Sequence, residues 1–245
     1  RRPAVLLFED IHLADSSSAC LLRSILEEPW TAALFICVYR PEFRLFSDRR
    51  TRQLPLETRQ IRLPPLSAPE VGQMIESLLT APALPDGLQQ FVENKVEGNP
   101  FYLEEVINSM VEDGTLVREK DRWRLSRPLA EADVPTTIHG VISARLDRLD
   151  RRSRTVLQEA AVIGRCFQCD ILRQATSSAE SELEQVLSGL EETRLIHERP
   201  DQPDPAFMFK HAMIQEVADG TLLRADRQAI HARIAAVIER LYPER

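Results

Sequence analysis

Two acidic residues follow the first apolar run of the chain. Glu9 and Asp10 come directly after Val5-Leu6-Leu7-Phe8. A run of this length and composition predicts a strand buried on both faces of a parallel sheet, and acids at its carboxyl end would project into the crevice where open α/β sheets bind ligands. One carboxylate there can hold Mg²⁺, directly or through water, while the other polarises an attacking water. A strand that merely ends in acids beside a polar loop fits the pair equally well.

A second apolar run, at residues 32–39, ends in Arg40. Between the two runs, Asp15 is placed to cap a helix that ends at Pro29. If the second run forms the neighbouring strand, Arg40 could reach the terminal phosphate of a nucleotide, and the alternative is a surface arginine. Residues 58–63 are predicted to form a last strand. Several arginines in the preceding loop are predicted to form a solvated or subunit-facing surface: Arg44, Arg49, Arg50 and Arg52.

The phosphate-binding motif G-x-x-x-x-G-K-[ST] is absent from all 245 residues. In P-loop enzymes this loop precedes the acid-bearing strand, and here four residues precede that strand. We expect a fragment of a longer protein, cut downstream of the loop, because the chain lacks an initiator Met; a degenerate relative is the alternative. Since the loop supplies the N–H groups and the lysine that cradle the phosphates, residues 1–245 alone should bind ATP weakly or not at all.

The composition predicts a folded, cytoplasmic protein of one or two domains. Apolar residues make up 43% and charged residues 28%, as in ordinary packed domains. No apolar run approaches the roughly 20 residues of a membrane helix, and the net charge of −7 argues against a strongly basic nucleic-acid surface. The C-x-x-C spacing at Cys166 and Cys169 lacks the further ligands of a zinc site, so these cysteines, with Cys20 and Cys37, are predicted to be buried small apolar side chains.

After residue 63 the pattern changes to helices. Ser67 with Glu70 predicts a capping box, and Asp86 is placed to cap a second helix. Gly98-Asn99-Pro100 predicts a tight elbow, because glycine suits a left-handed residue, asparagine caps the next helix and proline fits its first position. The elbow needs no ligand to explain it. Residues 115–118 and 122–125 are predicted to form a hairpin, and residues 126–135 a linker.

Helical patterns recur beyond the linker, at residues 137–149, 152–163 and 180–190. Two strand patterns follow at residues 194–199 and 206–210, and helices followed by a hairpin are typical of a winged helix. Two more helical patterns, at 211–223 and 226–241, complete the chain, and His211 opens the first of them.

In this order the chain resembles the STAND branch of AAA+-like signalling ATPases, and within it the ATPase region that follows class III adenylate or guanylate cyclase domains in large bacterial proteins. The resemblance covers nearly the whole chain and is carried by residues 6–15, 97–105, 134–137, 143–149, 209–216 and 232–243. It implies an α/β remnant of a P-loop ATPase core at 1–63, a mostly α helical lid at 64–132, a winged-helix domain at 133–210, and helices at 211–245 that lead into a helical or TPR repeat region.

The resemblance also implies roles for residues at matching positions. Glu9 matches the acid associated with Mg²⁺ and Asp10 the acid that orients water, so that both count as Walker B residues. Arg40 ends the sensor-1 strand, Gly98-Asn99-Pro100 matches a turn that lies over adenine, and His211 matches a histidine that touches the β-phosphate. His12 and Asp15 would shape the loop and the cap. The missing phosphate loop and Leu13, where the family commonly has Trp, depart from the pattern.

The implied protein is a switch that binds ATP or ADP with Mg²⁺. ADP holds the ATPase core, lid and winged helix closed, and exchange for ATP releases them. Its implied partners are an attached effector, such as a cyclase, a LuxR-type DNA-binding domain or a kinase, and further copies on activation. One alternative is a winged-helix transcriptional regulator of LuxR-type architecture, against which the lack of a basic recognition face counts. The other is a catalytically dead interaction scaffold.

Overall fold

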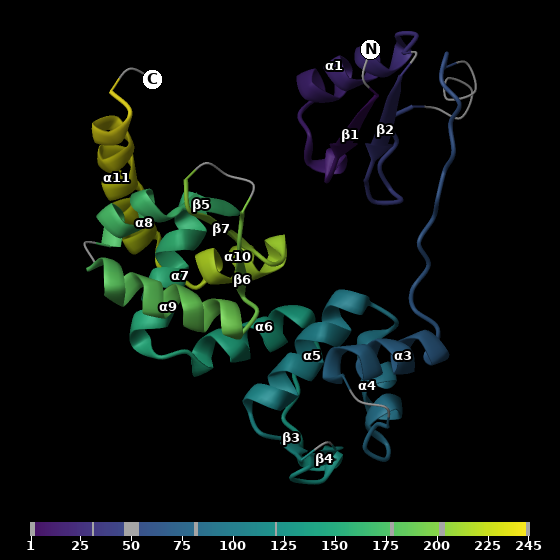
Figure 1. Ribbon diagram of the computed structural model, residues 1–245, viewed down its shortest axis with the longest axis vertical. Coiled ribbons are helices and arrows are strands. Elements are labelled where there is room, and N and C mark those ends of the chain that lie inside the picture. The colour runs from purple at the N-terminus through teal and green to yellow at the C-terminus, as the bar shows by residue number, and fades with distance from the viewer. Residues whose placement is uncertain are drawn as a thin grey trace. The chain divides into compact units, whose positions relative to one another are not determined.

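A computed structural model describes residues 3–30, 32–46, 54–80, 83–120, 122–176, 179–200 and 204–243 (Figure 1). The chain divides into two compact units, Arg1–Pro64 and Pro65–Arg245, and each is described here by itself. The division lies beside the boundary expected at residue 63. Among the described residues, no helix is long and apolar enough to cross a membrane.

The first unit is a small β–α–β arrangement. Strand β1 (Ala4–Phe8) leads through the 3-10 turn η1 (Ile11–Leu13) into helix α1 (Ser16–Glu27), and strand β2 (Ala33–Cys37) then pairs parallel with β1. The carboxylate of Asp15 caps α1 by accepting the backbone N–H groups of Ser17 and Ser18, at 2.8 and 2.9 Å. The two predicted strands and the predicted cap are therefore confirmed.

Within the described residues of this unit, these strands are buried on one face and not on both as predicted. Phe8 and Phe35 pack towards the α1 side, around a core of Ile11, Leu22, Leu26 and Leu45. The opposite face is open, and the exposed fractions of Val5, Leu7 and Leu34 are 68%, 55% and 56%. Within the described part of this unit, the packed side chains lie on one face of the two-stranded sheet only.

The strand predicted at residues 58–63 is also wrong. These residues have no regular secondary structure, and Ile61 and Leu63 are exposed. An extended segment becomes a strand only when a neighbour accepts its hydrogen bonds, and no described strand pairs with it. Arg44 is exposed, as predicted. Arg49, Arg50 and Arg52 lie outside the described residues.

The second unit begins with three helices and a hairpin: α3 (Ala68–Leu79), α4 (Leu88–Val96), α5 (Pro100–Glu112), β3 (Leu116–Glu119) and β4 (Arg122–Leu125). We call the core that these elements enclose the first core; its fully buried members include Val71, Leu103 and Met110. The capping box of Ser67 and Glu70 and the hairpin are confirmed. Asp86 is not the cap of α4, because Gly87, with φ 76°, occupies that position.

The rest of the unit surrounds a second core and, where α11 packs on α7 and α8, a smaller third core. Its elements are α6 (Ile138–Arg148), α7 (Arg151–Ile163), β5 (Cys166–Gln168), α8 (Cys169–Thr176), α9 (Glu180–Glu192), β6 (Ile196–Glu198), β7 (Ala206–Phe209), α10 (Ala212–Gly220) and α11 (Arg224–Leu241). Strand β7 lies between β5 and β6 in an antiparallel sheet. The predicted helices and strands are present, while β5 and α8 were not predicted. Helix α6 contributes to both cores, Val141 to the first and Ile142 and Leu146 to the second.

Candidate functional site

The acid pair and Arg40 lie at the same edge of the parallel sheet. Phe8 and Cys37 are paired at the ends of β1 and β2, and the N–H of Val38 donates to the carbonyl of Phe8 at 2.8 Å. Glu9 and Asp10 therefore leave β1 where Arg40 follows β2, at the carboxyl end of both strands. All three residues are exposed, and Asp10 adopts a left-handed conformation with φ 53°. Exposed carboxylate oxygens are ligands that Mg²⁺ accepts together with water and phosphate.

The Gly98-Asn99-Pro100 elbow has the predicted geometry. Gly98 has φ 72°, Asn99 caps α5 by accepting the N–H of Tyr102 at 3.1 Å, and Pro100 is the first residue of the helix. A Cβ on Gly98 would lie 2.6 Å from the carbonyl oxygen of Leu66, so close packing against the preceding segment already requires glycine here. Asn99 and Pro100 are exposed at the outside of the turn.

His211 is the N-cap of helix α10 and lies two residues after the end of strand β7. Its Nδ1 accepts the backbone N–H of Met213 at 3.2 Å. An imidazole nitrogen that accepts a hydrogen bond carries no proton, so this contact assigns the proton of the neutral ring to Nε2. Nε2 is therefore the atom with which His211 can donate to an anion.

The structure brings the elbow and His211 together through residues that the sequence did not single out. The ring of Phe101, which follows Pro100, stacks on the His211 ring with centroids 3.7 Å apart and planes 16° apart. Lys210, beside His211, forms an ion pair with Glu104, which lies three residues after Phe101 on α5. The N-terminal turn of α5 and the start of α10 thus form one junction, although they are more than a hundred residues apart in sequence.

A buried charge cluster farther along α5 was also missed. Arg145 of α6 has an exposed fraction of 1%, and its Nη1 donates to Glu105, which is fully buried. Its Nη2 donates to Glu112 at 2.6 Å and to the carbonyl of Thr193 at 2.5 Å. Burial raises the pKa of Glu105, and Arg145 opposes that rise. Glu105 and Glu112 lie seven residues apart on one helix, a spacing that puts both carboxylates on one face.

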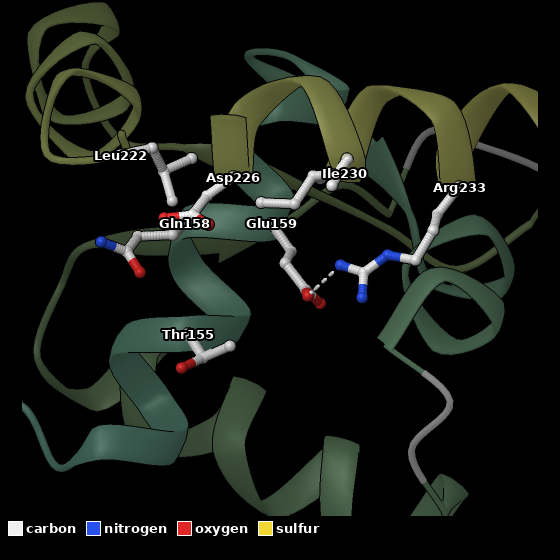
Figure 2. Close-up of a pocket in the computed structure, with 8 residues that line it drawn as sticks. Thr155, Gln158, Glu159, Leu222, Asp226, Ile230 and Arg233 are labelled. Carbon is white, nitrogen blue, oxygen red and sulfur yellow. Dashed lines mark hydrogen bonds and ion pairs between the residues drawn. The ribbon is translucent and has the colours of Figure 1, made fainter. Parts of the chain in front are cut away.

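The described residues also form a shallow cavity of about 300 Å³ between α7 and α11 (Figure 2). Figure 2 shows Glu159 reaching from α7 towards Arg233 of α11, and these side chains are hydrogen-bonded at 2.5 Å. None of the residues predicted to bind nucleotide lines this cavity.

The cysteines are not the buried apolar side chains that were predicted. Cys20 and Cys166 are exposed, and Cys37 and Cys169 are half-buried; all four are free. Burial raises the pKa of the Cys169 thiol to about 11, which disfavours the thiolate that metal binding and redox chemistry require. Within the described ranges, no group of three or more His, Cys, Asp or Glu side chains is placed to hold a metal ion.

This architecture is similar to that of a solved signalling protein. The crystal structure of a Signal Transduction ATPase with Numerous Domains (STAND) protein with a tetratricopeptide repeat sensor, from Pyrococcus horikoshii, matches 98% of this chain and 31% of that chain, with a TM-score of 0.64 at 11% sequence identity. The chain has a STAND-like fold. No protein-family model matches the sequence.

Two curated relatives are much longer than this chain. An uncharacterized protein of Rhizobium meliloti is 27% identical over an alignment of 249 positions, which covers 97% of this chain and 22% of the relative. The peroxide stress-activated histidine kinase mak3 of Schizosaccharomyces pombe is 25% identical over 253 residues, covering 94% of this chain and 10% of the kinase. The STAND-like region thus matches a small part of each.

Proposed function

We propose that this chain is part of an ATP-dependent signalling switch that regulates an attached effector. The observation that carries the proposal is the likeness to a STAND signalling ATPase along nearly the whole chain. In this proposal residues 1–63 are the last part of a P-loop ATPase core, residues 64–132 the helical lid, residues 133–210 a winged helix, and residues 211–245 the start of a helical repeat region. The order of these elements and their lengths support it.

The proposed nucleotide contacts come from each unit separately. In the first unit, Glu9 would hold Mg²⁺, directly or through water, Asp10 would orient the attacking water, and Arg40 would sense the terminal phosphate. Their exposure at the carboxyl edge of a parallel sheet supports these roles. In the second unit, Gly98, Asn99 and Pro100 would lie over adenine, and the Nε2–H of His211 would donate to a phosphate oxygen. Bound ATP or ADP supplies the difference between the two states of the switch.

The effector that we propose is a signalling enzyme elsewhere in the full-length protein. The sequence resemblance favours an adenylate or guanylate cyclase, and the histidine kinase among the relatives supports a kinase as the other choice. Self-assembly on activation belongs to the same proposal.

The test uses the full-length protein and measures ATP turnover and its Mg²⁺ dependence. Asp10→Asn should slow hydrolysis by about 100-fold with binding largely intact, because it removes water orientation and leaves the phosphate contacts. Glu9→Gln should raise the Mg²⁺ concentration needed for binding by about tenfold. Glu42→Gln, an exposed acid of the same unit, is the matched control and should change neither.

Three results would contradict the proposal in different ways. Unchanged turnover in both variants would show that the acid pair is not the hydrolytic site. If the unmodified protein binds no ATP or ADP at all, the catalytically dead scaffold is the correct description. Tight DNA binding in the absence of nucleotide would favour the winged-helix regulator.

A further inference from the structure

The junction between the elbow and His211 depends on where helix α5 lies against the second core. Phe101 and Glu104 are in the first two turns of α5, and they contact His211 and Lys210. A stack with centroids 3.7 Å apart tolerates little sliding, because the contact energy of two rings falls off within about 1 Å of separation. A further contact must therefore hold the rest of α5 in position.

Arg145 supplies that fixed point. The Glu105 and Glu112 side chains come from the middle and the end of α5, and both accept hydrogen bonds from the single guanidinium of Arg145. The same guanidinium donates to the carbonyl of Thr193, the C-cap of α9, where the helix dipole favours a cation. One side chain thus joins three helices, since Arg145 itself belongs to α6.

The charged residues of this cluster are better suited to fixing the positions of the helices than to adding stability. Two carboxylates share one guanidinium, and Oε1 of Glu105 is buried without a hydrogen-bond partner. Apolar residues of similar volume often stabilise a buried site as well as charges do, whereas the rigid fork of an arginine fixes both the distance and the direction of its partners. Arg148 makes a further hydrogen bond nearby, in which its Nη1 donates to the Ser109 hydroxyl at 2.9 Å.

We propose that Arg145 is the positioning residue of the elbow–His211 junction. It holds α5 against α6 and α9 and so keeps Phe101 stacked on His211, while touching no nucleotide itself. The proposal rests on the proposed function for the meaning of the junction, because the elbow and His211 are the two nucleotide contacts of the second unit. The claim that Arg145 holds α5 in position depends only on the contacts described above.

The experiment records side-chain NMR signals of the histidines in residues 1–245. The ring current of Phe101 shifts the His211 ring protons upfield, and that shift reports the stack directly. His211→Asn identifies the signal, and Phe101→Leu gives its position without the stack. Arg145→Leu should lose the upfield shift at temperatures well below its melting point, with a Tm lowered by about 10 °C because the buried carboxylate of Glu105 loses its partner.

Two further variants make the result decisive. Arg154→Leu is the matched control, because Arg154 pairs with Asp147 at 2.7 Å on the exposed surface; it should keep the shift. Glu112→Leu leaves Arg145 and Glu105 as a balanced pair, so it should fold, and it should reduce the shift. A folded Arg145→Leu protein with the His211 signal unchanged would overturn the proposal. If that variant does not fold, an unchanged signal in Glu112→Leu would overturn it instead.

A separate arm distinguishes failure of this proposal from failure of the proposed function. In the full-length protein, ADP should raise the Tm less in Arg145→Leu than in the unmodified protein. If ADP gives no stabilisation even in the unmodified protein, the nucleotide function fails while the NMR result still decides the role of Arg145.

Discussion

His211 makes two contacts in this structure that require no nucleotide. It caps α10 through Nδ1 and stacks on Phe101. Removing the side chain must therefore weaken the fold whether or not His211 also touches a phosphate. A loss of stability on mutation cannot by itself support a switch role, and the competing explanation, a histidine that only packs between two parts of the unit, predicts the same loss.

A pair of substitutions separates the two roles. His211→Asn keeps an N-cap acceptor, whereas His211→Ala removes it, so the alanine variant alone should lose about 1 kcal/mol of capping free energy. Both variants lack the Nε2–H donor, and both should lose part of the ADP-induced rise in Tm, corresponding to roughly 1–3 kcal/mol. The measurement is thermal unfolding of the full-length protein with and without ADP. His231→Ala, an exposed histidine of α11, should behave as the unmodified protein; undiminished ADP stabilisation in both His211 variants would leave only the packing role.

Local residue chemistry was predictable, and the long-range partners were not. The left-handed Gly98, the Asn99 cap and Pro100 at the first helical position follow from backbone preferences of those residue types, and the structure has all three. Phe101 and Arg145 gave no such signal. Their partners lie 110 residues away, at His211, and 40 residues away, at Glu105, and a single sequence does not show which distant residues meet.

Several helix N-termini in this chain are capped by side chains that the local sequence identifies. At α7, the carboxylate of Asp150 accepts the N–H groups of Arg152 and Ser153, at 2.8 and 3.0 Å. The Ser153 hydroxyl donates to the same carboxylate at 2.5 Å. The Ser153 hydroxyl and then its N–H hold the pKa of Asp150 below the ordinary value of 3.8.

The lowered pKa of Asp150 determines the direction in which folding stability should change with pH. A carboxyl whose pKa is lower in the folded state stabilises the fold above its ordinary pKa, and that contribution is lost as the pH falls through the folded value. Asp150→Asn retains a neutral cap, so its deficit in unfolding free energy should be present at pH 7 and should shrink below the ordinary value of 3.8. Urea unfolding of both proteins across this range measures it. A deficit independent of pH would contradict this origin, and Asp133→Asn, an exposed acid outside the caps, is the control.

The elements that were mispredicted share one physical cause. Residues 58–63 have the composition of a strand but lack a described neighbour to pair with. Strand β5 has three residues and α8 has eight, so each gives only a short sequence signal, and tertiary contacts help to establish both. Strand pairing and packing are properties of the assembled unit, whereas capping and periodicity are properties of a short stretch of chain.

At the scale of the whole molecule, the first unit presents an open apolar sheet face. Val5 is paired with Leu34 and Leu7 with Ile36, so these four side chains gather on the face away from the core of the unit. A contiguous apolar patch of this kind promotes association in water. Residues 1–245 should therefore self-associate as their concentration rises.

Sedimentation velocity over a concentration series measures this association. Leu7→Thr combined with Leu34→Thr should shift its onset to about tenfold higher concentration, because two apolar side chains lose contact area. Leu223→Thr changes an even more exposed leucine, with an exposed fraction of 73%, at the start of α11, and it should leave the onset unchanged. A single sedimentation coefficient at all concentrations for the unmodified chain would contradict the expectation.

Helix α6 contributes Val141 to the first core, and Ile142 and Leu146 to the second core. Neither core can lose its structure while the other keeps a complete set of neighbours, since melting either one strips half of the same helix. The two cores are therefore thermodynamically coupled, and partly unfolded forms with one intact half are disfavoured. The first and second cores should therefore unfold together, so a substitution that destabilises either one lowers the population of both.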